Sequence, residues 1–378
     1  MSDSSRFSSK TEARIISLEG LSAEQIREHR GIQQAAEIIQ NDGLVAFPTE
    51  TVYGLGANAL SPEAVAAIYR AKHRPGDNPS IVHIAELSDL GKVAPIEDER
   101  IFDLLDHFWP GPLTVILPAG ASPIAAVSFS GLSTVAVRMP DHPVALELIK
   151  QTGLPIAAPS ANRSGRPSPT SASHVAAELG NAIPLILDGG RCQVGLESTV
   201  LDLSGEAPTI VRPGRIGVSE LAEKMGTEVL LPEASSSPRS PGTRYAHYQP
   251  SVPVLSFFNW RQDAPASLAP LLEHLGLLAH LELSDIAFIG PDLDDLEVGA
   301  SRLRLSDGEL AHHLYSDLWE LERLGPRLIV IYAQRPSTAV QDRLRRCSRC
   351  VIEVSGDTSS LGAEAADAIL ASLHLDLP

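Results

Sequence analysis

Two positively charged side chains, Lys72 and Arg74, stand in a short loop that reads Lys-His-Arg-Pro-Gly. One explanation is structural, because cations at the C-terminal end of a helix interact favourably with the helix dipole. The other explanation is functional. Pro75, Gly76 and Asn78 fix the shape of the loop, and a loop of fixed shape is an unusual place for two cations without a ligand. These residue types therefore indicate a site for an anion.

A second polar group follows the apolar run at residues 156–158. Ser160 and Asn162 stand just beyond this run, and Arg166 lies in a loop closed by two prolines. Short hydroxyl and amide side chains at such a position often only form turns, and that alternative stays open for Ser160 and Asn162. Arginine suits phosphate because its planar guanidinium bonds two oxygens at once. The loop therefore predicts a guanidinium directed toward the same strand end.

Further ionisable residues stand next to apolar strand residues. Arg138 ends the run at 134–137, where a solvated charge is the alternative to a ligand contact. His83 alternates with apolar neighbours, so a buried structural histidine competes with a functional one. Glu50 and Glu197 are the nearest carboxylates, and either could bind magnesium or act as a base. The residues alone leave these alternatives and the metal ligands open.

The stretch at 43–78 indicates which elements position these side chains. An apolar, β-favouring run at 44–47 is interrupted by Pro48 and followed by polar residues, which is where α/β proteins place ligands. Gly54 and Gly56 are expected to form a tight turn, and a helix is expected to run from Pro62 to the cationic loop. An amphipathic helix is expected at 21–40. Further strands are expected at 81–84, 113–117, 135–138, 156–158, 185–187, 199–203 and 209–211. Several of these strands follow one another without a helix, so a mixed sheet that carries helices is predicted.

The composition changes at residues 232–250, which are rich in Pro, Ser, Gly and Arg and predict an extended connection. After it, strands alternate with helices, one of which opens with a capping box at Ser306, and a small parallel, Rossmann-like layer is predicted. The strand candidates there are 253–257, 286–289, 328–332 and 351–354. The expected organisation is a disordered N-terminus at 1–13, a first domain at 14–228 that carries the predicted anion site, a linker at 229–251 and an α/β domain at 252–378.

The chain of 378 residues carries a net charge of −17. Tight binding to nucleic acid or to an anionic membrane is therefore not expected, because each phosphate contact needs a cation. No apolar run approaches the ~20 residues that a membrane span needs, and the N-terminus lacks the apolar core of a signal peptide. Three cysteines are too few for a disulfide framework in a chain of this size. A cytoplasmic protein is expected.

Five motifs stand in one order along the chain: the stretch at 43–78, TVAVRMP at 134–140, PSANRSGRPSPT at 159–170, GLEST at 195–199 and VRPG at 211–214. Together they resemble the YrdC-like family of threonylcarbamoyl-AMP synthases in its long, two-domain form. The resemblance covers most of residues 14–220. It implies an α/β fold in which a YrdC-like mixed, twisted sheet with helices is followed by a smaller Rossmann-like domain. It also implies that residues 241–250 fold over the active site as a lid.

The resemblance also assigns roles to individual residues. Lys72 and Arg74 are implied to be catalytic. The implied nucleotide contacts are Arg74, Asn78, Thr134, Ser160, Asn162, Arg166, Arg212 and His247. The implied contacts to L-threonine are Thr49, His83, Arg138, Ala158 and Ser198.

The implied reaction is that of a nucleotidyltransferase, which combines L-threonine, bicarbonate or carbon dioxide, and ATP, with Mg²⁺, into threonylcarbamoyl-AMP and pyrophosphate. By the same resemblance, a downstream tRNA threonylcarbamoyl transferase machinery receives the product. Two alternatives are an RNA-binding module, which the negative charge disfavours, and a carbamoyl transferase of the same fold. The latter carries zinc-finger segments, and this chain has no cysteine array to match them.

Overall fold

The computed structural model describes residues 12–76, 78–96, 98–231, 248–258, 281–290, 302–304 and 306–353. The chain divides into two compact units whose segments interleave along the sequence. The first unit comprises Met1–Ser164, Pro169–Cys192 and Asp202–Pro208, and the second comprises Gly165–Ser168, Gln193–Leu201 and Thr209–Pro378. Most of the expected disordered segment and most of the expected lid lie outside the described residues. The expected domain boundaries at 14–228, 229–251 and 252–378 stay predictions.

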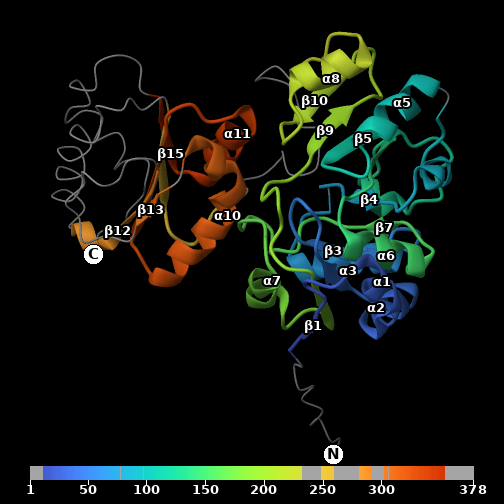
Figure 1. The fold of residues 1–378 in the computed structure, drawn as a ribbon, viewed down its shortest axis with the longest axis horizontal. Coiled ribbons are helices and arrows are strands. Elements are labelled where there is room, and N and C mark those ends of the chain that lie inside the picture. Colours follow the sequence, from blue (N-terminus) through green and yellow to red (C-terminus); the bar gives the residue numbers. More distant parts are fainter. Residues whose placement is uncertain are drawn as a thin grey trace, which may run out of the picture. The chain divides into compact units, whose positions relative to one another are not determined.

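A mixed sheet forms the centre of the first unit, as the sequence predicts (Figure 1). The strands of this sheet that lie wholly in the first unit are, in spatial order, β1 (Arg14–Ser17), β8 (Leu185–Asp188), β2 (Val45–Phe47), β3 (Gly54–Asn58), β7 (Ile156–Ala157), β4 (Ile81–His83), β6 (Thr134–Arg138) and β5 (Leu113–Pro118). Strand β8 is parallel to both β1 and β2, and β4 is parallel to β6. The pairs β2–β3, β3–β7, β4–β7 and β5–β6 are antiparallel.

Strand β3 corrects one expectation. The tight turn expected at Gly54 and Gly56 is a strand instead, and it runs antiparallel to β2. A Cβ on Gly56 would lie 2.7 Å from Phe47 Cε1. Glycine is needed there for close packing against a neighbouring ring rather than for a turn.

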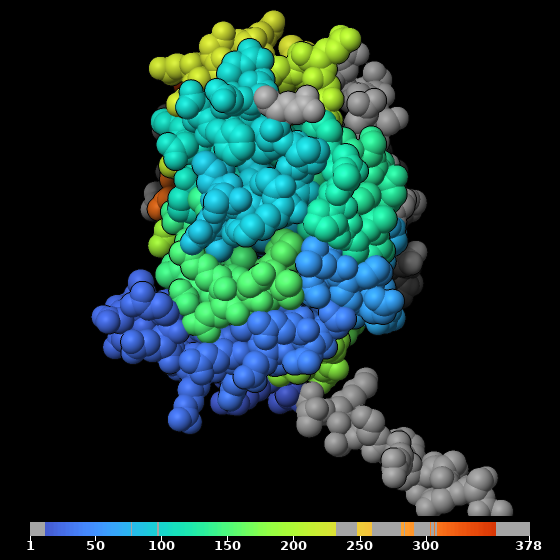
Figure 2. Space-filling model, turned by 90° about the vertical axis from the view of Figure 1, so that its right-hand side faces the viewer, coloured from blue at the N-terminus to red at the C-terminus, as the bar shows by residue number. Residues whose placement is uncertain are grey.

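Helices complete the first unit: α1 (Ala23–Glu28), α2 (Arg30–Gln40), α3 (Pro62–Lys72), α4 (Leu90–Val93), α5 (Glu99–Phe108), α6 (Pro143–Thr152) and α7 (Ala172–Leu179). The single helix expected at 21–40 is in fact two, because His29 adopts an extended conformation and its ring accepts a hydrogen bond from the Gly31 N–H at 3.0 Å. Helix α6 packs against α1 and α2, and residues near 150 lie beside the N-terminal helices in Figure 2. Buried apolar residues of α2, α6, β2 and β8 share one core, among them Ile32, Ile39, Phe47, Leu148 and Leu187.

The second unit contains a parallel five-stranded sheet, which confirms the predicted Rossmann-like layer (Figure 1). Its strands, in spatial order, are β13 (Arg302–Arg304), β12 (Ile286–Gly290), β14 (Leu328–Ala333), β11 (Val254–Phe258) and β15 (Cys350–Glu353). Helix α10 (Asp307–Leu324) begins with the expected capping box at Ser306, and α11 (Thr338–Cys347) precedes β15. The same unit contains β10 (Thr209–Arg212), α8 (Val218–Met225) and most of β9 (Thr199–Asp202). No helix in the described part of the chain is long and apolar enough to cross a membrane.

Candidate functional site

Lys72 is the last residue of α3, and its side chain is only 1% exposed. His73 ends the helix in the left-handed conformation with φ of 50°. The Lys72 Nζ donates hydrogen bonds to the main-chain carbonyls of Ser160 and Asn162, which follow β7. Burial lowers the pKa of Lys72 well below its usual value, and the charge of Arg74 lowers it further while Glu178 opposes the change. The two polar groups singled out in the sequence therefore do converge.

Arg74 lies just beyond the end of α3 and fixes the loop that follows it. Its Nε donates to the Asn78 carbonyl at 3.1 Å, and its Nη2 donates to the Pro79 carbonyl at 2.9 Å. The Tyr69 hydroxyl also donates to the Asn78 carbonyl, at 3.1 Å. Asn78 is buried. The cationic loop is therefore ordered by its own residues.

Ser160 and Asn162 make local contacts. The Ser160 hydroxyl donates to Asn162 Oδ1 at 2.6 Å, and Asn162 Nδ2 donates to the Arg163 carbonyl at 2.7 Å. Such local contacts are expected if Ser160 and Asn162 only form a turn. A nucleotide contact by either residue stays a prediction.

Arg138 is a buried residue, 4% exposed, and not a solvated charge at a strand end. Its Nη2 lies 2.6 Å from Glu50 Oε1 in an ion pair. Its Nη1 donates to the Thr51 hydroxyl at 2.8 Å, and its Nε donates to the Gly111 carbonyl at 3.2 Å. Within the described residues, Arg138 Nη2 and both carboxylate oxygens of Glu50 make no hydrogen bond of good geometry. Arg138 Nη2 and Glu50 Oε1 contact each other in the ion pair, and Glu50 Oε2 is left without a partner among the described residues.

His83 lies beside this pair, since it is the register partner of Arg138 across β4 and β6. Burial lowers its pKa to about 3, and the charge of Arg138 contributes in the same direction. Carbonyl oxygens of Ile81 and Ile156 only partly oppose the change. The imidazole is therefore neutral at physiological pH. Its ring meets Phe47 edge to face, with centroids 6.2 Å apart.

The other predicted residues of the first unit are Thr49, Thr134 and Ala158. Thr49 Oγ1 donates to the Val52 carbonyl at 2.7 Å and lies 2.8 Å from the Thr51 hydroxyl, so much of its bonding capacity is used internally. Ala158 is buried and begins the segment that leads to Ser160. Thr134 begins β6 and Arg138 ends it, about 13 Å apart along an extended strand.

Of the predicted residues in the second unit, three lie in the described part of the chain, and each has partners. Arg212 Nη2 donates to the Ser198 hydroxyl at 3.0 Å, and Arg212 Nε donates to the Ser198 carbonyl at 3.1 Å. Arg166 Nη2 lies 2.6 Å from Glu322 Oε2, and the guanidinium lies over the Trp319 ring, 5.2 Å from its centroid. Sequence reasoning missed Glu322 and Trp319, because nothing local connects them to Arg166. His247 lies outside the described residues.

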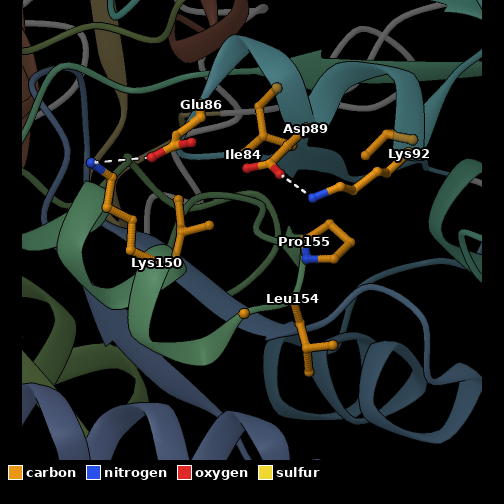
Figure 3. Close-up of a pocket in the computed structure, with 10 residues that line it drawn as sticks. Ile84, Glu86, Asp89, Lys92, Lys150, Leu154 and Pro155 are labelled. Carbon is orange, nitrogen blue, oxygen red and sulfur yellow. Dashed lines mark hydrogen bonds and ion pairs between the residues drawn. The ribbon is translucent and has the colours of Figure 1, made fainter.

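A pocket of 340 Å³ lies elsewhere on the first unit (Figure 3). It is lined by residues at 84–93 and 149–155, none of which carries a predicted role. Lys92 and Lys150 pair with Asp89 and Glu86, at 2.8 and 3.7 Å. The pocket contains no residue of the candidate site.

Comparison with known proteins supports the function that the five sequence motifs imply. The family described as Telomere recombination matches residues 37–214, and the Threonylcarbamoyl-AMP synthase C-terminal domain matches residues 216–348. The threonylcarbamoyl-AMP synthase of Bacillus subtilis (strain 168) is 49% identical over 226 residues, which span 59% of this chain and 65% of that protein. The synthase of Pyrococcus abyssi (strain GE5 / Orsay) is 38% identical over 341 residues, which span 86% of this chain and 96% of that protein.

A solved structure extends the comparison to the fold. The crystal structure of P. abyssi Sua5 complexed with L-threonine matches with a TM-score of 0.82 at 38% identity, over 91% of this chain and 100% of that chain. The likeness in fold therefore extends over both units of this chain. The chain belongs to the threonylcarbamoyl-AMP synthases, a family of nucleotidyltransferases, in their two-domain form.

Proposed function

We propose that the chain forms L-threonylcarbamoyl-AMP and pyrophosphate from L-threonine, bicarbonate or carbon dioxide, and ATP. The observation that carries this proposal is the buried Arg138–Glu50 ion pair, in which Glu50 Oε2 has no partner among the described residues. Buried polar atoms without partners are rare and call for a ligand or another explanation. An α-amino acid carries one carboxylate and one amine, which match the two charges of this pair.

In this proposal Arg138 binds the carboxylate of L-threonine in a charge-assisted pair. Glu50 accepts a hydrogen bond from the amine and so holds the nitrogen in place for reaction with carbon dioxide. Thr51 and Gly111 orient the guanidinium through their hydrogen bonds. The neutral His83 adds no second positive charge beside Arg138.

The second half of the reaction needs neutralisation of charge rather than a protein nucleophile. The carbamate oxygen attacks the α-phosphorus of ATP, a P–O bond forms, and the bond to pyrophosphate breaks. Arg74 supplies positive charge to the triphosphate, and the bound phosphates favour protonation of Lys72, whose pKa burial otherwise lowers. A buried cation acts more strongly there than one in water. Lys72 also ties the Ser160 loop to the end of α3.

In this proposal magnesium enters the site bound to the phosphates of ATP. Among the described residues no group of three or more His, Cys, Asp or Glu side chains could hold a metal. Glu50 pairs with Arg138, and Glu197 accepts hydrogen bonds from three side chains. Mg²⁺ usually binds through one or two carboxylates together with substrate phosphates. When bound, it would neutralise charge on the leaving pyrophosphate.

The product carries a reactive mixed anhydride, so a following enzyme must use it. We place the chain before the transfer of the threonylcarbamoyl group to adenosine in tRNA, in a cytoplasmic reaction sequence. The apolar and hydroxyl-bearing character of the predicted threonine contacts supports an amino acid with both a methyl and a hydroxyl group.

Substrate choice tests the proposal. Pyrophosphate release from ATP and Mg²⁺ should require both bicarbonate and threonine. Serine lacks one methyl group and should react with ~10–200-fold lower efficiency. Valine lacks the hydroxyl and should lose up to ~10⁴-fold, because a polar partner such as Ser198 is then left without its hydrogen bond. Equal rates with all three amino acids, or release that ignores bicarbonate, would refute the proposal.

A further inference from the structure

One buried carboxylate has no role in the proposed reaction. Glu197 stands in the GLEST motif directly before Ser198, and three side chains donate to it. Its Oε1 accepts a hydrogen bond from the Ser168 hydroxyl at 2.5 Å. Its Oε2 accepts hydrogen bonds from the Tyr315 hydroxyl at 3.0 Å and from Arg343 Nε at 2.9 Å. All four residues are buried, and we call Ser168, Glu197, Tyr315 and Arg343 the Glu197 cluster.

The Glu197 cluster joins four segments of the second unit. Ser168 belongs to the loop of Arg166, and Glu197 belongs to the loop before β9. Tyr315 lies on α10, and Arg343 lies on α11. One carboxylate therefore connects two loops that carry predicted ligand contacts with two helices of the C-terminal sheet layer.

The main chain of the motif loop also rests directly on α10. Gly195 has a φ of +76°, and a Cβ at this position would lie 2.1 Å from the carbonyl oxygen of His312. Only glycine permits both the conformation and the close approach. His312 precedes Tyr315 by one helical turn, so the same part of α10 contacts the loop through its backbone and through a side chain.

The charges in the Glu197 cluster are fixed. Burial alone would raise the pKa of Glu197, but the charges of Arg343 and Arg212 and the bond from Ser168 hold it at about 2. The carboxylate is therefore ionised at neutral pH. Arg343 Nη1 donates to Asp342 at 2.7 Å, whereas its Nη2 has no hydrogen-bond partner among the described residues. A buried ion pair with an unmatched donor is a poor source of stability, which favours a role in positioning.

Ser198 is thereby held from two sides. Arg212 donates to the hydroxyl and to the carbonyl of Ser198. The preceding residue, Glu197, is anchored by the side chains of its cluster. We propose that Tyr315 and Arg343 are positioning residues for the synthase reaction, which act through Glu197 to hold Ser198 and the Arg166 loop in the conformation that receives the substrates. This inference rests on the proposed function, in which Ser198 contacts L-threonine and Arg166 contacts ATP.

The experiment compares Tyr315→Phe and Arg343→Met with the wild-type protein in the full-length chain. Tyr315→Phe removes one hydroxyl and keeps the buried ring. Arg345→Met is the matched control, because Arg345 lies on the same helix, is exposed, and has its guanidinium over the Phe258 ring, 5.3 Å from the ring centroid. We expect the KM for threonine to rise about 10-fold in Tyr315→Phe and about 100-fold in Arg343→Met, and to change less than about twofold in the control.

Thermal unfolding of each variant separates positioning from folding. A role in stability alone would lower the melting temperature of Tyr315→Phe and leave its KM for threonine and its kcat at wild-type values, and that result would overturn the proposal. A double-mutant cycle gives the second readout. Tyr315→Phe should have less than about twofold further effect in a Glu197→Gln background. The same effect in both backgrounds would overturn the route through Glu197.

Pyrophosphate release by the wild-type protein distinguishes a failure of the proposed function from a failure of the positioning role. If it releases no pyrophosphate in response to threonine, the proposed function fails, and so does the inference that depends on it. If it does, and both Tyr315→Phe and Arg343→Met keep the wild-type KM for threonine and for ATP, only the positioning role is refuted.

Discussion

Arg138 shows what a single buried residue adds to a motif. The sequence allowed either a solvated charge or a ligand contact, and its burial and its ion pair with Glu50 exclude the first. The partner itself could not be predicted, because Glu50 had been considered only as a base or a metal ligand. Nothing in the chain between them indicates that Arg138 and Thr51, 87 positions apart, share a hydrogen bond.

Removing the Arg138 guanidinium should weaken binding of threonine and leave binding of ATP nearly intact. Arg138→Ala removes a charge-assisted bond, typically worth ~1.5–3 kcal/mol, so the KM for threonine should rise ~10–200-fold. Steady-state kinetics with each substrate varied in turn measures the effect. Arg100→Ala is the control, because Arg100 is exposed and pairs with the nearby Asp98 at the surface. An equal rise in the KM for ATP would contradict the assignment.

His83 should make the protein less stable in mild acid. Its folded pKa of about 3 lies below the usual 6.5, so the unfolded chain binds the extra proton between these values. The stabilising contribution is complete above pH 6.5 and is lost as the pH falls toward 3, at up to ~1.4 kcal/mol per pH unit. Urea unfolding at pH 7.5, 6.5 and 5.5 measures this slope. His83→Gln should show a smaller slope than the wild type, and identical slopes would argue against a buried neutral imidazole.

Helices and strands were predicted well where a local sequence pattern determines them. They were predicted less well where tertiary contacts determine the backbone conformation. Buried apolar runs identified β2, β4, β8, β11 and β14, and the capping box identified the start of α10. The break between α1 and α2 was missed. A Cβ on Gly31 would lie 2.7 Å from Ile16 Cγ2, so the close approach of β1 determines the geometry there, and residue periodicity does not report it. The same holds for Gly56 against Phe47.

Gly195 is the sharpest test of packing between elements. In Gly195→Ala the left-handed φ and the contact with the His312 carbonyl both oppose a Cβ, so we expect a loss of ~2–4 kcal/mol in the free energy of unfolding. Chemical denaturation measures it.

Gly308→Ala is the matched control, because Gly308 lies in the first turn of α10 and a Cβ added there would meet no atom within 4 Å. That change should be neutral or stabilising by up to ~1 kcal/mol. A Gly195→Ala protein as stable as Gly308→Ala would show that α10 does not press on the loop.

At the scale of the whole molecule, the net charge of −17 disfavours tight binding to polyanions such as nucleic acids. We expect the protein to bind tRNA more weakly than ~1 μM at 150 mM salt, since too few cations are available for displacing counterions. Fluorescence anisotropy with labelled tRNA at several salt concentrations measures both the affinity and its salt dependence. Tight binding with a steep salt slope would instead support the RNA-binding alternative.

The interleaved units also set an order of events during synthesis. Arg343 follows Glu197 by 146 positions, so a ribosome that adds ~5–20 residues per second makes the cation about 7–30 s after the carboxylate. During that interval the nascent chain holds Glu197 and Ser168 without their helical partners. The GLEST loop can reach its final conformation only after Arg343 has been made, so a segment synthesised later completes the surroundings of the motif.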